Sequence, residues 1–178
     1  MPYKCIAMYP PNKLVRTSIY KDNELLPYPG INMWEDNGLM YRVLYYSKII
    51  VQIHGCYYHY RRNNSSSITH GYGKNAVYQM INCASQLSDF FSSQPDATEY
   101  KEVTTFIKYL AKIDLITDTY RGIIDYKKTF PDVKLPPKKF DKSAFSSKGL
   151  IRYYFVRYHF AWLFVLLYKI INRINVFR

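Results

Sequence analysis

The sequence predicts an α-rich α/β fold, and three observations lead to this class. Apolar residues recur at helical spacing in residues 36–47, 75–92 and 98–118. Residues 149–175 form a long apolar and aromatic run that contains Arg and Lys, which is also typical of a helix. One segment, residues 48–62, instead shows the period of two that is typical of β-strands.

The first part of the chain is expected to contain two helices separated by a loop. A short helix is expected over residues 14–23. Residues 26–34 include two prolines and a glycine, which oppose regular structure and predict a loop. The helix over residues 36–47 follows. Its apolar side chains fall on one face, namely Leu39, Met40, Val43 and Leu44.

The segment 48–62 predicts a β-hairpin. Ile49, Val51 and Ile53 alternate with other residues, Gly55 interrupts the run, and tyrosines alternate again at positions 58 and 60. A hairpin alone makes a poor sheet. We therefore expect this chain to form part of a larger structure.

Composition divides the chain into four expected parts. They are a domain that carries the hairpin (1–70), a helical extension packing on it (71–130), a proline-containing linker (131–148) and a basic, aromatic, amphipathic helix (149–178). No internal repeat is visible.

The charge of the chain favours an anionic partner. Its 178 residues include 25 Lys and Arg against 13 Asp and Glu, a formal net charge of +12. Such an excess attracts nucleic acid, an acidic membrane surface or a phosphorylated substrate. Three widely spaced cysteines predict neither a disulfide framework nor a zinc site, which fits a reducing cytosol. The first residues lack the apolar run of a signal peptide.

An acidic pair, Glu35-Asp36, opens the apolar segment GINMWEDNGLMYRVLYY in this basic chain. One interpretation is structural, because carboxylates at a helix start accept hydrogen bonds from free N–H groups and suit the positive end of the helix dipole. The other is a carboxylate that acts as a general base beside a substrate-facing loop. The pair alone supports both.

The surroundings of the pair resemble the acceptor-side half of bacterial family 2 glycosyltransferases, which have the GT-A fold. The resemblance covers residues 12–69, about a third of the chain. Five motifs carry it in order: Asn12-Lys13-Leu14 with Arg16, Pro29-Gly30, Glu35-Asp36, Tyr58-His59-Tyr60-Arg61 and Ser67-Ile68-Thr69. The implied fold is a partial GT-A domain with a hairpin and flanking helices.

The resemblance also implies roles for residues. Asp36 matches the base that takes a proton from the acceptor hydroxyl during inverting sugar transfer, and Glu35 would orient the site or bind the acceptor. Trp34 would stack on a sugar ring, although a core aromatic is an equal interpretation. Arg61 and Arg62 would contact the donor diphosphate, unless they are an exposed hairpin end. The implied substrate-binding set is Lys13, Trp34, Tyr60, Arg61 and Arg62.

The chain also departs from this family. A complete enzyme begins with a nucleotide-binding half that carries an Asp-x-Asp motif for Mg or Mn, and no Asp-x-Asp occurs in this sequence. The sequence therefore predicts a truncated glycosyltransferase with no cofactor or metal site of its own. The expected donor is a nucleotide sugar, and the acceptor is a saccharide or a lipid-linked saccharide. Because the reactants would not be brought together, we expect the isolated chain to be weakly active or inactive.

The tail predicts a cytoplasmic protein that is peripheral at the inner face of the cell membrane. Residues 160–168 form an uninterrupted apolar core shorter than the roughly 20 residues that a span needs. Tyr, Trp and flanking cations suit anionic headgroups. The alternatives are packing on the chain's own domain and, less favoured, a true span.

Two other functions are consistent with the sequence. The chain is a noncatalytic, membrane-associated helper of a separate nucleotide-binding chain, or it is a basic protein that binds nucleic acid through cations and stacked tyrosines. No nucleic-acid motif is present, and the cations are spread along the chain. The sequence therefore ranks nucleic acid below the membrane as a partner.

Overall fold

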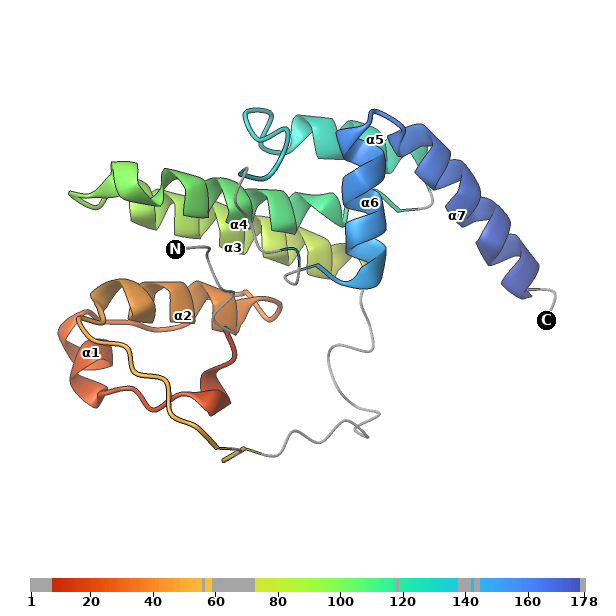
Figure 1. Ribbon diagram of the computed structural model, residues 1–178. Helices are drawn as coiled ribbons and strands as arrows, with labels where there is room; N and C mark the ends of the chain where they lie inside the picture. Colours follow the sequence, from red (N-terminus) through yellow and green to blue (C-terminus); the bar gives the residue numbers. More distant parts are fainter. Residues whose placement is uncertain are drawn as a thin grey trace. The chain divides into compact units, whose positions relative to one another are not determined.

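The computed structural model describes residues 8–55, 57–58, 73–117, 119–137, 142 and 145–176, with residues 172–176 described by their backbone alone. Within these ranges the regular structure is helical, and no β-strand is present. The elements in order are η1 (Pro10–Asn12), α1 (Thr17–Asp22), α2 (Glu35–Tyr46), α3 (Lys74–Ser92), η3 (Ala97–Tyr100), α4 (Lys101–Ile113), α5 (Tyr120–Lys128), α6 (Ser147–Arg157) and α7 (Ala161–Val176), as labelled in Figure 1. The predicted α-rich character is thus confirmed.

The chain divides into two compact units, Ile6–Phe90 and a second unit that contains Phe91–Arg178. This division lies inside the segment 71–130 that the sequence assigns to one helical extension. The first unit contains α1, α2 and most of α3. The second contains α4 to α7.

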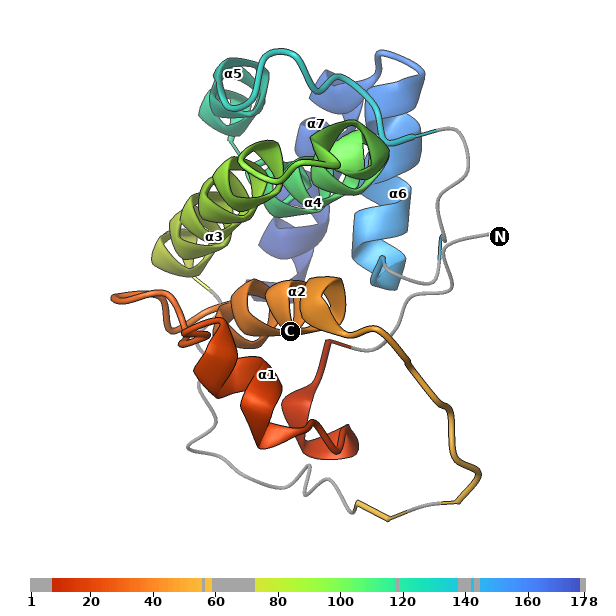
Figure 2. The same cartoon turned by 90° about the vertical axis from the view of Figure 1, so that its left-hand side faces the viewer.

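The first unit is built around α2. Helix α1 lies beside α2 (Figures 1 and 2). Leu25, which follows α1, forms a buried apolar cluster with Met40 and Val43 of α2. At the end of α2, the Tyr45 ring meets the ring of Phe90 from α3 edge to face, with centroids 5.5 Å apart. The predicted helices over 36–47 and 75–92 are therefore confirmed, with apolar faces that are largely buried.

The predicted β-hairpin is wrong for the residues that the structure describes. Residues 48–54 have no regular structure, and Ile49 and Val51 are 82% and 75% exposed. The second half of the predicted hairpin falls largely outside the described residues. The physical reason is the weakness of an isolated two-stranded ribbon, which has no third strand or covering helix to bury its apolar faces.

Helices α4, α5, α6 and α7 all contribute to an apolar core of the second unit. Helix α7 packs against α5 and α6, and α6 also packs against α4. The buried members of the core are Tyr109, Ile113, Ile116, Tyr126, Val133, Tyr153, Phe164 and Val165. Because Val133 belongs to this core, the start of the segment predicted as a linker is packed against the unit.

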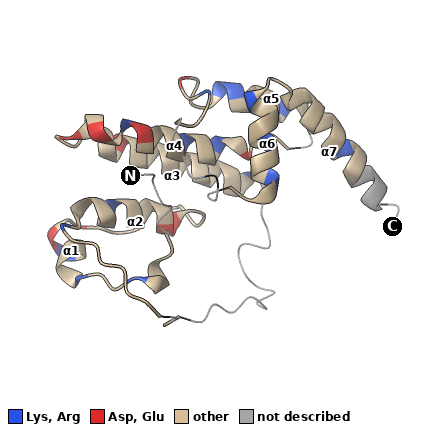
Figure 3. Ribbon diagram, in the orientation of Figure 1, with Lys and Arg blue, Asp and Glu red and all other residues tan. Residues whose placement is uncertain are grey.

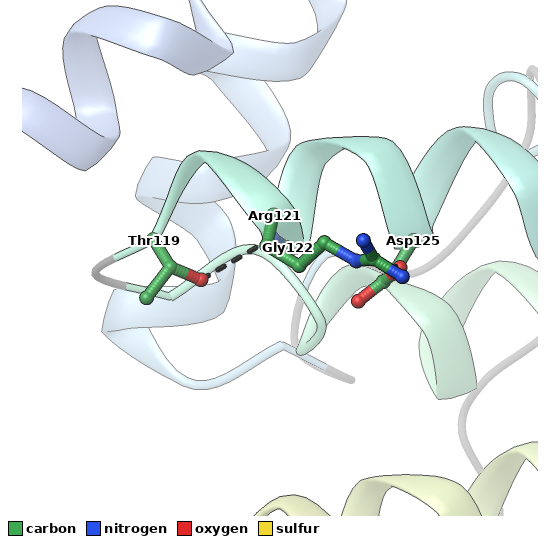
Figure 4. Close-up of polar contacts among 4 residues, drawn as sticks. All are labelled: Thr119, Arg121, Gly122 and Asp125. Carbon is green, nitrogen blue, oxygen red and sulfur yellow. Dashed lines mark hydrogen bonds and ion pairs between the residues drawn. The ribbon is translucent and has the colours of Figure 1, made fainter.

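Helix α5 was not expected from the sequence, and its start explains how it forms. The Thr119 hydroxyl accepts a hydrogen bond from the Gly122 N–H at 3.3 Å, and Arg121 pairs with Asp125 at 3.1 Å one turn later (Figure 4). Gly122 is required for a close approach, since a Cβ there would lie 2.2 Å from the Leu115 carbonyl oxygen. The helix is short and rich in polar residues, so few apolar side chains mark it in the sequence.

The single long helix predicted over residues 149–175 is wrong, because the chain breaks between α6 and α7. His159 has a φ of 65°. The His159 N–H donates to the Val156 carbonyl at 3.1 Å and the Phe160 N–H donates to the Phe155 carbonyl at 2.7 Å. These bonds form a Schellman motif, which satisfies the last carbonyls of α6. A histidine in this position is uncommon, since glycine is the usual residue there.

Lys112 of α4 is a buried cation that holds the end of α5. It is 1% exposed, and its ammonium group donates to the carbonyl oxygens of Thr129 and Phe130 at 3.0 and 2.9 Å. The group also lies 4.4 Å from the ring centre of Tyr126. Burial lowers the pKa of Lys112 to about 8, and the charge of Asp132 opposes this shift.

We expect Lys112→Met to lower the free energy of unfolding by about 1–3 kcal/mol, because two carbonyl groups lose their charged donor. Urea unfolding followed by tryptophan fluorescence measures this loss. Lys101→Met, at the exposed start of the same helix, is the control and should change stability little.

The pH dependence of stability supplies a second check on Lys112. The unfolded chain binds more protons at this residue than the folded chain does between about pH 8 and 10.5. The wild type should therefore gain stability relative to Lys112→Met across that interval, and a constant difference would contradict the assignment.

Candidate functional site

The candidate site is the start of α2, where the acidic pair occupies the first turn of the helix. Figure 3 shows these acidic residues in red at one end of α2. The Glu35 side chain is exposed and Asp36 is half-buried. Asp36 Oδ1 accepts hydrogen bonds from the Asn37 backbone N–H at 2.8 Å and from the Asn37 side-chain amide at 3.1 Å. Asp36 thus binds one of the free donors of the first turn, and part of the carboxylate remains open to solvent.

Trp34 precedes the pair in a strained conformation. It is the N-cap residue of α2 with a φ of 71°, a region that bulky residues rarely adopt. Its carbonyl oxygen accepts hydrogen bonds from the Gly38 N–H at 2.9 Å and from the Cys83 thiol at 3.3 Å. Its side chain is half-buried, so the indole is neither a core residue nor fully free.

Lys13, another predicted site residue, interacts electrostatically with Asp36. Its ammonium group donates to the Tyr9 carbonyl at 3.0 Å and to Asn12 Oδ1 at 2.7 Å. Partial burial lowers the pKa of Lys13, and the negative charge of Asp36 opposes this shift. The two side chains are therefore within electrostatic range of each other, although they lie 23 positions apart in the sequence.

The loop before α2 is held by α3 through Gln79. The side-chain oxygen of Gln79 accepts hydrogen bonds from the backbone N–H groups of Asn32 and Met33, at 2.8 and 3.0 Å. One acceptor therefore fixes two consecutive peptide groups directly before Trp34. Sequence reasoning missed Gln79, because a glutamine on a helix surface has no pattern that marks it.

Arg42 supports the other side of the first turn. It is 8% exposed, and its Nε donates to the Gly38 carbonyl at 2.7 Å while another guanidinium nitrogen donates to the Leu26 carbonyl. The guanidinium carbon lies 4.0 Å from the ring centre of Tyr28. Sequence reasoning missed this role as well. The available signal was an arginine located among the apolar positions of the predicted helix.

Gly38 allows Tyr28 and Cys83 to approach α2 closely. A Cβ at this position would lie 2.9 Å from the Tyr28 ring and 3.1 Å from the Cys83 sulfur. Burial raises the pKa of the Cys83 thiol to about 12, so this group stays protonated and acts as a hydrogen-bond donor. Cys83 therefore has a structural role beneath the candidate site.

Tyr60, Arg61 and Arg62, the remaining predicted substrate-binding residues, lie outside the residues that the structure describes. Within the described ranges, no group of three or more His, Cys, Asp or Glu side chains could hold a metal ion. The site as described therefore consists of Lys13, Trp34, Glu35 and Asp36 with their supports. Chemically it offers one exposed and one half-buried carboxylate, a cation and an aromatic ring.

Comparison with known proteins finds no family model, no curated protein and no solved structure that matches this chain. The interpretation of the site therefore rests on its residues and their geometry.

We predict that Gln79→Met loosens the start of α2, because two backbone N–H groups lose their acceptor. The expected loss is about 1 kcal/mol in the free energy of unfolding, since both N–H groups are partly open to water. Urea unfolding measures it, with Gln86→Met on the same helix as the control. Gln86 donates a hydrogen bond on the helix surface to Asn82 at 3.3 Å and holds no loop among the described residues. Equal losses in the two variants would contradict the role of Gln79.

Proposed function

We propose that this chain provides the acceptor side of an inverting glycosyltransferase similar to the family 2 enzymes, with Asp36 as the general base. The observation that supports this best is the half-buried carboxylate of Asp36 at the start of α2, held by Asn37 and within electrostatic range of Lys13. A carboxylate that keeps part of its surface open can accept a proton from a bound hydroxyl. Two further features of the same helix start, Trp34 and Glu35, are suited to binding a saccharide.

The reaction then follows a single displacement. The acceptor hydroxyl gives its proton to Asp36 while its oxygen forms a bond to the anomeric carbon of the donor sugar. The bond from that carbon to the nucleotide diphosphate breaks on the opposite side, and the configuration inverts. Mg or Mn held by a donor-binding half would neutralise the leaving diphosphate. Arg61 and Arg62 are our candidates for contacts with the same group.

The positions of Trp34 and Glu35 give each a separate task. The indole of Trp34 is half-buried beside the pair, so one part of it is open for stacking on a sugar ring. The exposed Glu35 is suited to accept hydrogen bonds from other hydroxyls of the acceptor. The bond of the Trp34 carbonyl to Cys83 fixes this backbone, which favours a preorganised site.

We predict that a saccharide acceptor changes the fluorescence of Trp34 and that Asp36→Asn weakens its binding about tenfold, because a charge-assisted hydrogen bond is lost. The chain has two tryptophans, so Trp162→Phe leaves Trp34 as the single reporter. A panel of bacterial oligosaccharides is the probe, and Asp22→Asn at the exposed end of α1 is the control. Unchanged affinity in Asp36→Asn would refute the role of Asp36. A response to oligonucleotides alone would favour the nucleic-acid alternative.

The second part of the proposal is attachment of α7 to the inner surface of the cell membrane. Trp162, Leu166 and Ile170 repeat every four residues and are 51%, 39% and 46% exposed, while Phe164 and Val165 on the other side are buried. Helix α7 therefore packs on its unit with one face and presents an apolar face to solvent. No helix in the described part of the chain has the length and apolar character needed to cross a bilayer. An exposed apolar face in a chain of net charge +12 fits an anionic lipid surface.

We expect the chain to sediment with phosphatidylcholine vesicles that contain phosphatidylglycerol, and to bind less well to vesicles of phosphatidylcholine alone. The double variant Leu166→Glu, Ile170→Glu should lose this binding, since it places two charges in the apolar face. Ile124→Glu is the matched control, because Ile124 is an exposed apolar residue of α5. If the double variant binds as well as the control, α7 is not the attachment site.

A further inference from the structure

The turn between α6 and α7, residues 158–162, carries three large aromatic side chains on its surface, and we call it the aromatic corner. Tyr158 is 60% exposed, and Phe160 and Trp162 are each 51% exposed. Arg157 and His159, on either side of Tyr158, are also exposed. Aromatic side chains gain free energy when they are buried, so three exposed ones within five residues indicate a contact surface.

The backbone of the aromatic corner is fixed on both sides. At the end of α6, the N–H groups of His159 and Phe160 make the bonds of the Schellman motif. At the start of α7, the Phe160 carbonyl accepts hydrogen bonds from the N–H groups of Leu163 and Phe164, at 2.9 and 3.2 Å. The rings of Phe155 and Phe164 meet edge to face with centroids 5.8 Å apart, which joins α6 to α7. The exposed aromatic residues therefore belong to a rigid turn, and binding through them costs little conformational entropy.

Helix α7 extends the aromatic corner with an exposed surface that is wholly apolar. At 3.6 residues per turn, its exposed side chains fall within one half of the helix circumference. Lys169, the one charged residue among residues 161–171, is half-buried, and its ammonium group lies 4.8 Å from the ring centre of Tyr120 in α5. The exposed members of residues 161–171 are Trp162, Leu166, Leu167, Ile170 and Ile171.

The charges of this part of the chain have a single sign. Residues 142–178 contain seven Lys and Arg and no Asp or Glu. One of these cations, Arg152, pairs with Asp114 of α4. Lys142, Lys148 and Arg157 are exposed. An apolar surface accompanied by cations alone is complementary to an anionic phospholipid bilayer, which presents negative charge outside and hydrocarbon beneath it.

We propose that the aromatic corner is an anchor that inserts into the headgroup region of an anionic bilayer. This inference rests on the proposed membrane attachment, and it adds which residues enter the bilayer and how deeply they lie. Tyrosine and tryptophan prefer the headgroup level because each combines an apolar ring with a polar group, so Tyr158 and Trp162 set the depth. Leu166 and Ile170 then reach toward the hydrocarbon, while Arg157 stays with the lipid phosphates.

A second copy of this chain and a nucleic acid are poorer partners for this surface. Two copies joined through it would each bring seven cations and no carboxylate from residues 142–178. Bases of a nucleic acid would stack on the aromatic corner, and Arg157 would contact a phosphate. The same nucleic acid would leave the aliphatic side chains of Leu166 and Ile170 exposed to water. A bilayer accommodates the aromatic, the aliphatic and the charged residues together.

Quenching of tryptophan fluorescence in vesicles tests the depth of the aromatic corner. The vesicles contain phosphatidylglycerol and a phosphatidylcholine that carries a nitroxide label, placed either close to the headgroup or at the end of the acyl chain. We expect the label close to the headgroup to quench more strongly, since Trp162 lies at that level. The chain has two tryptophans, so Trp162→Phe leaves Trp34 alone and should lose this quenching.

The double variant Tyr158→Ser, Phe160→Ser should weaken binding to the same vesicles about tenfold or more, because two aromatic rings no longer leave water. It preserves the turn, since the Schellman motif uses backbone groups alone. Tyr57→Ser, Tyr78→Ser is the matched control, as these tyrosines of the first unit are 77% and 53% exposed. Sedimentation with the vesicles measures the binding of each variant.

The outcomes separate the anchor from the attachment face of α7. Vesicle binding without quenching of Trp162, or with equal losses in the two double variants, overturns the anchor and leaves the attachment of α7 standing. Binding that depends on the aromatic corner but not on Leu166 and Ile170 supports the anchor and refutes the face of α7. Absence of binding to anionic vesicles overturns both. Quenching that a single-stranded oligonucleotide abolishes by competition, or a dimer that depends on Phe160, overturns the choice of a bilayer as the partner.

Discussion

The contact of residues 32–34 with α3 is the constraint on which the first unit depends. The Gln79 side chain accepts hydrogen bonds from the N–H groups of Asn32 and Met33, and the Cys83 thiol donates to the Trp34 carbonyl. These bonds fix the backbone that leads into α2. This contact maintains the positive φ of Trp34, which would otherwise be costly for a tryptophan. The arrangement places Glu35 and Asp36 in the first turn, where the sequence alone permits both a structural and a chemical interpretation. The two interpretations are compatible, since Asp36 binds a first-turn N–H and remains partly open.

Helices α2 and α3 were predictable, because the apolar residues that they bury recur at helical spacing in the sequence. The face of α2 that carries Met40 and Val43 is an example, since both residues are in the core. The acidic pair was also found from the sequence. Its supports were not, since Gln79, Cys83 and Arg42 act through backbone contacts that lie far away in the chain or across a turn. No local pattern encodes such contacts.

The three differences between the predicted and the observed structure have different physical causes. The segment 48–54 has the pattern of a strand, but strand pairing is a long-range interaction and the described residues offer no partner strand. Helix α5 has few apolar residues, and its start depends on Thr119 and on the small size of Gly122. The break between α6 and α7 depends on His159, which has a positive φ. Glycine is the usual residue at such a position, so the sequence gives no signal of the break.

The position of Cys83 makes its thiol unreactive beneath the candidate site. A thiol alkylates or exchanges only as the thiolate, and this one is fully buried with a pKa raised to about 12. Electrophiles in solution can therefore reach Cys83 only when α2 and α3 separate and the thiol returns to water. That local opening therefore sets the rate at which Cys83 becomes modified. The same rate measures how often α3 separates from the start of α2, where the acidic pair lies.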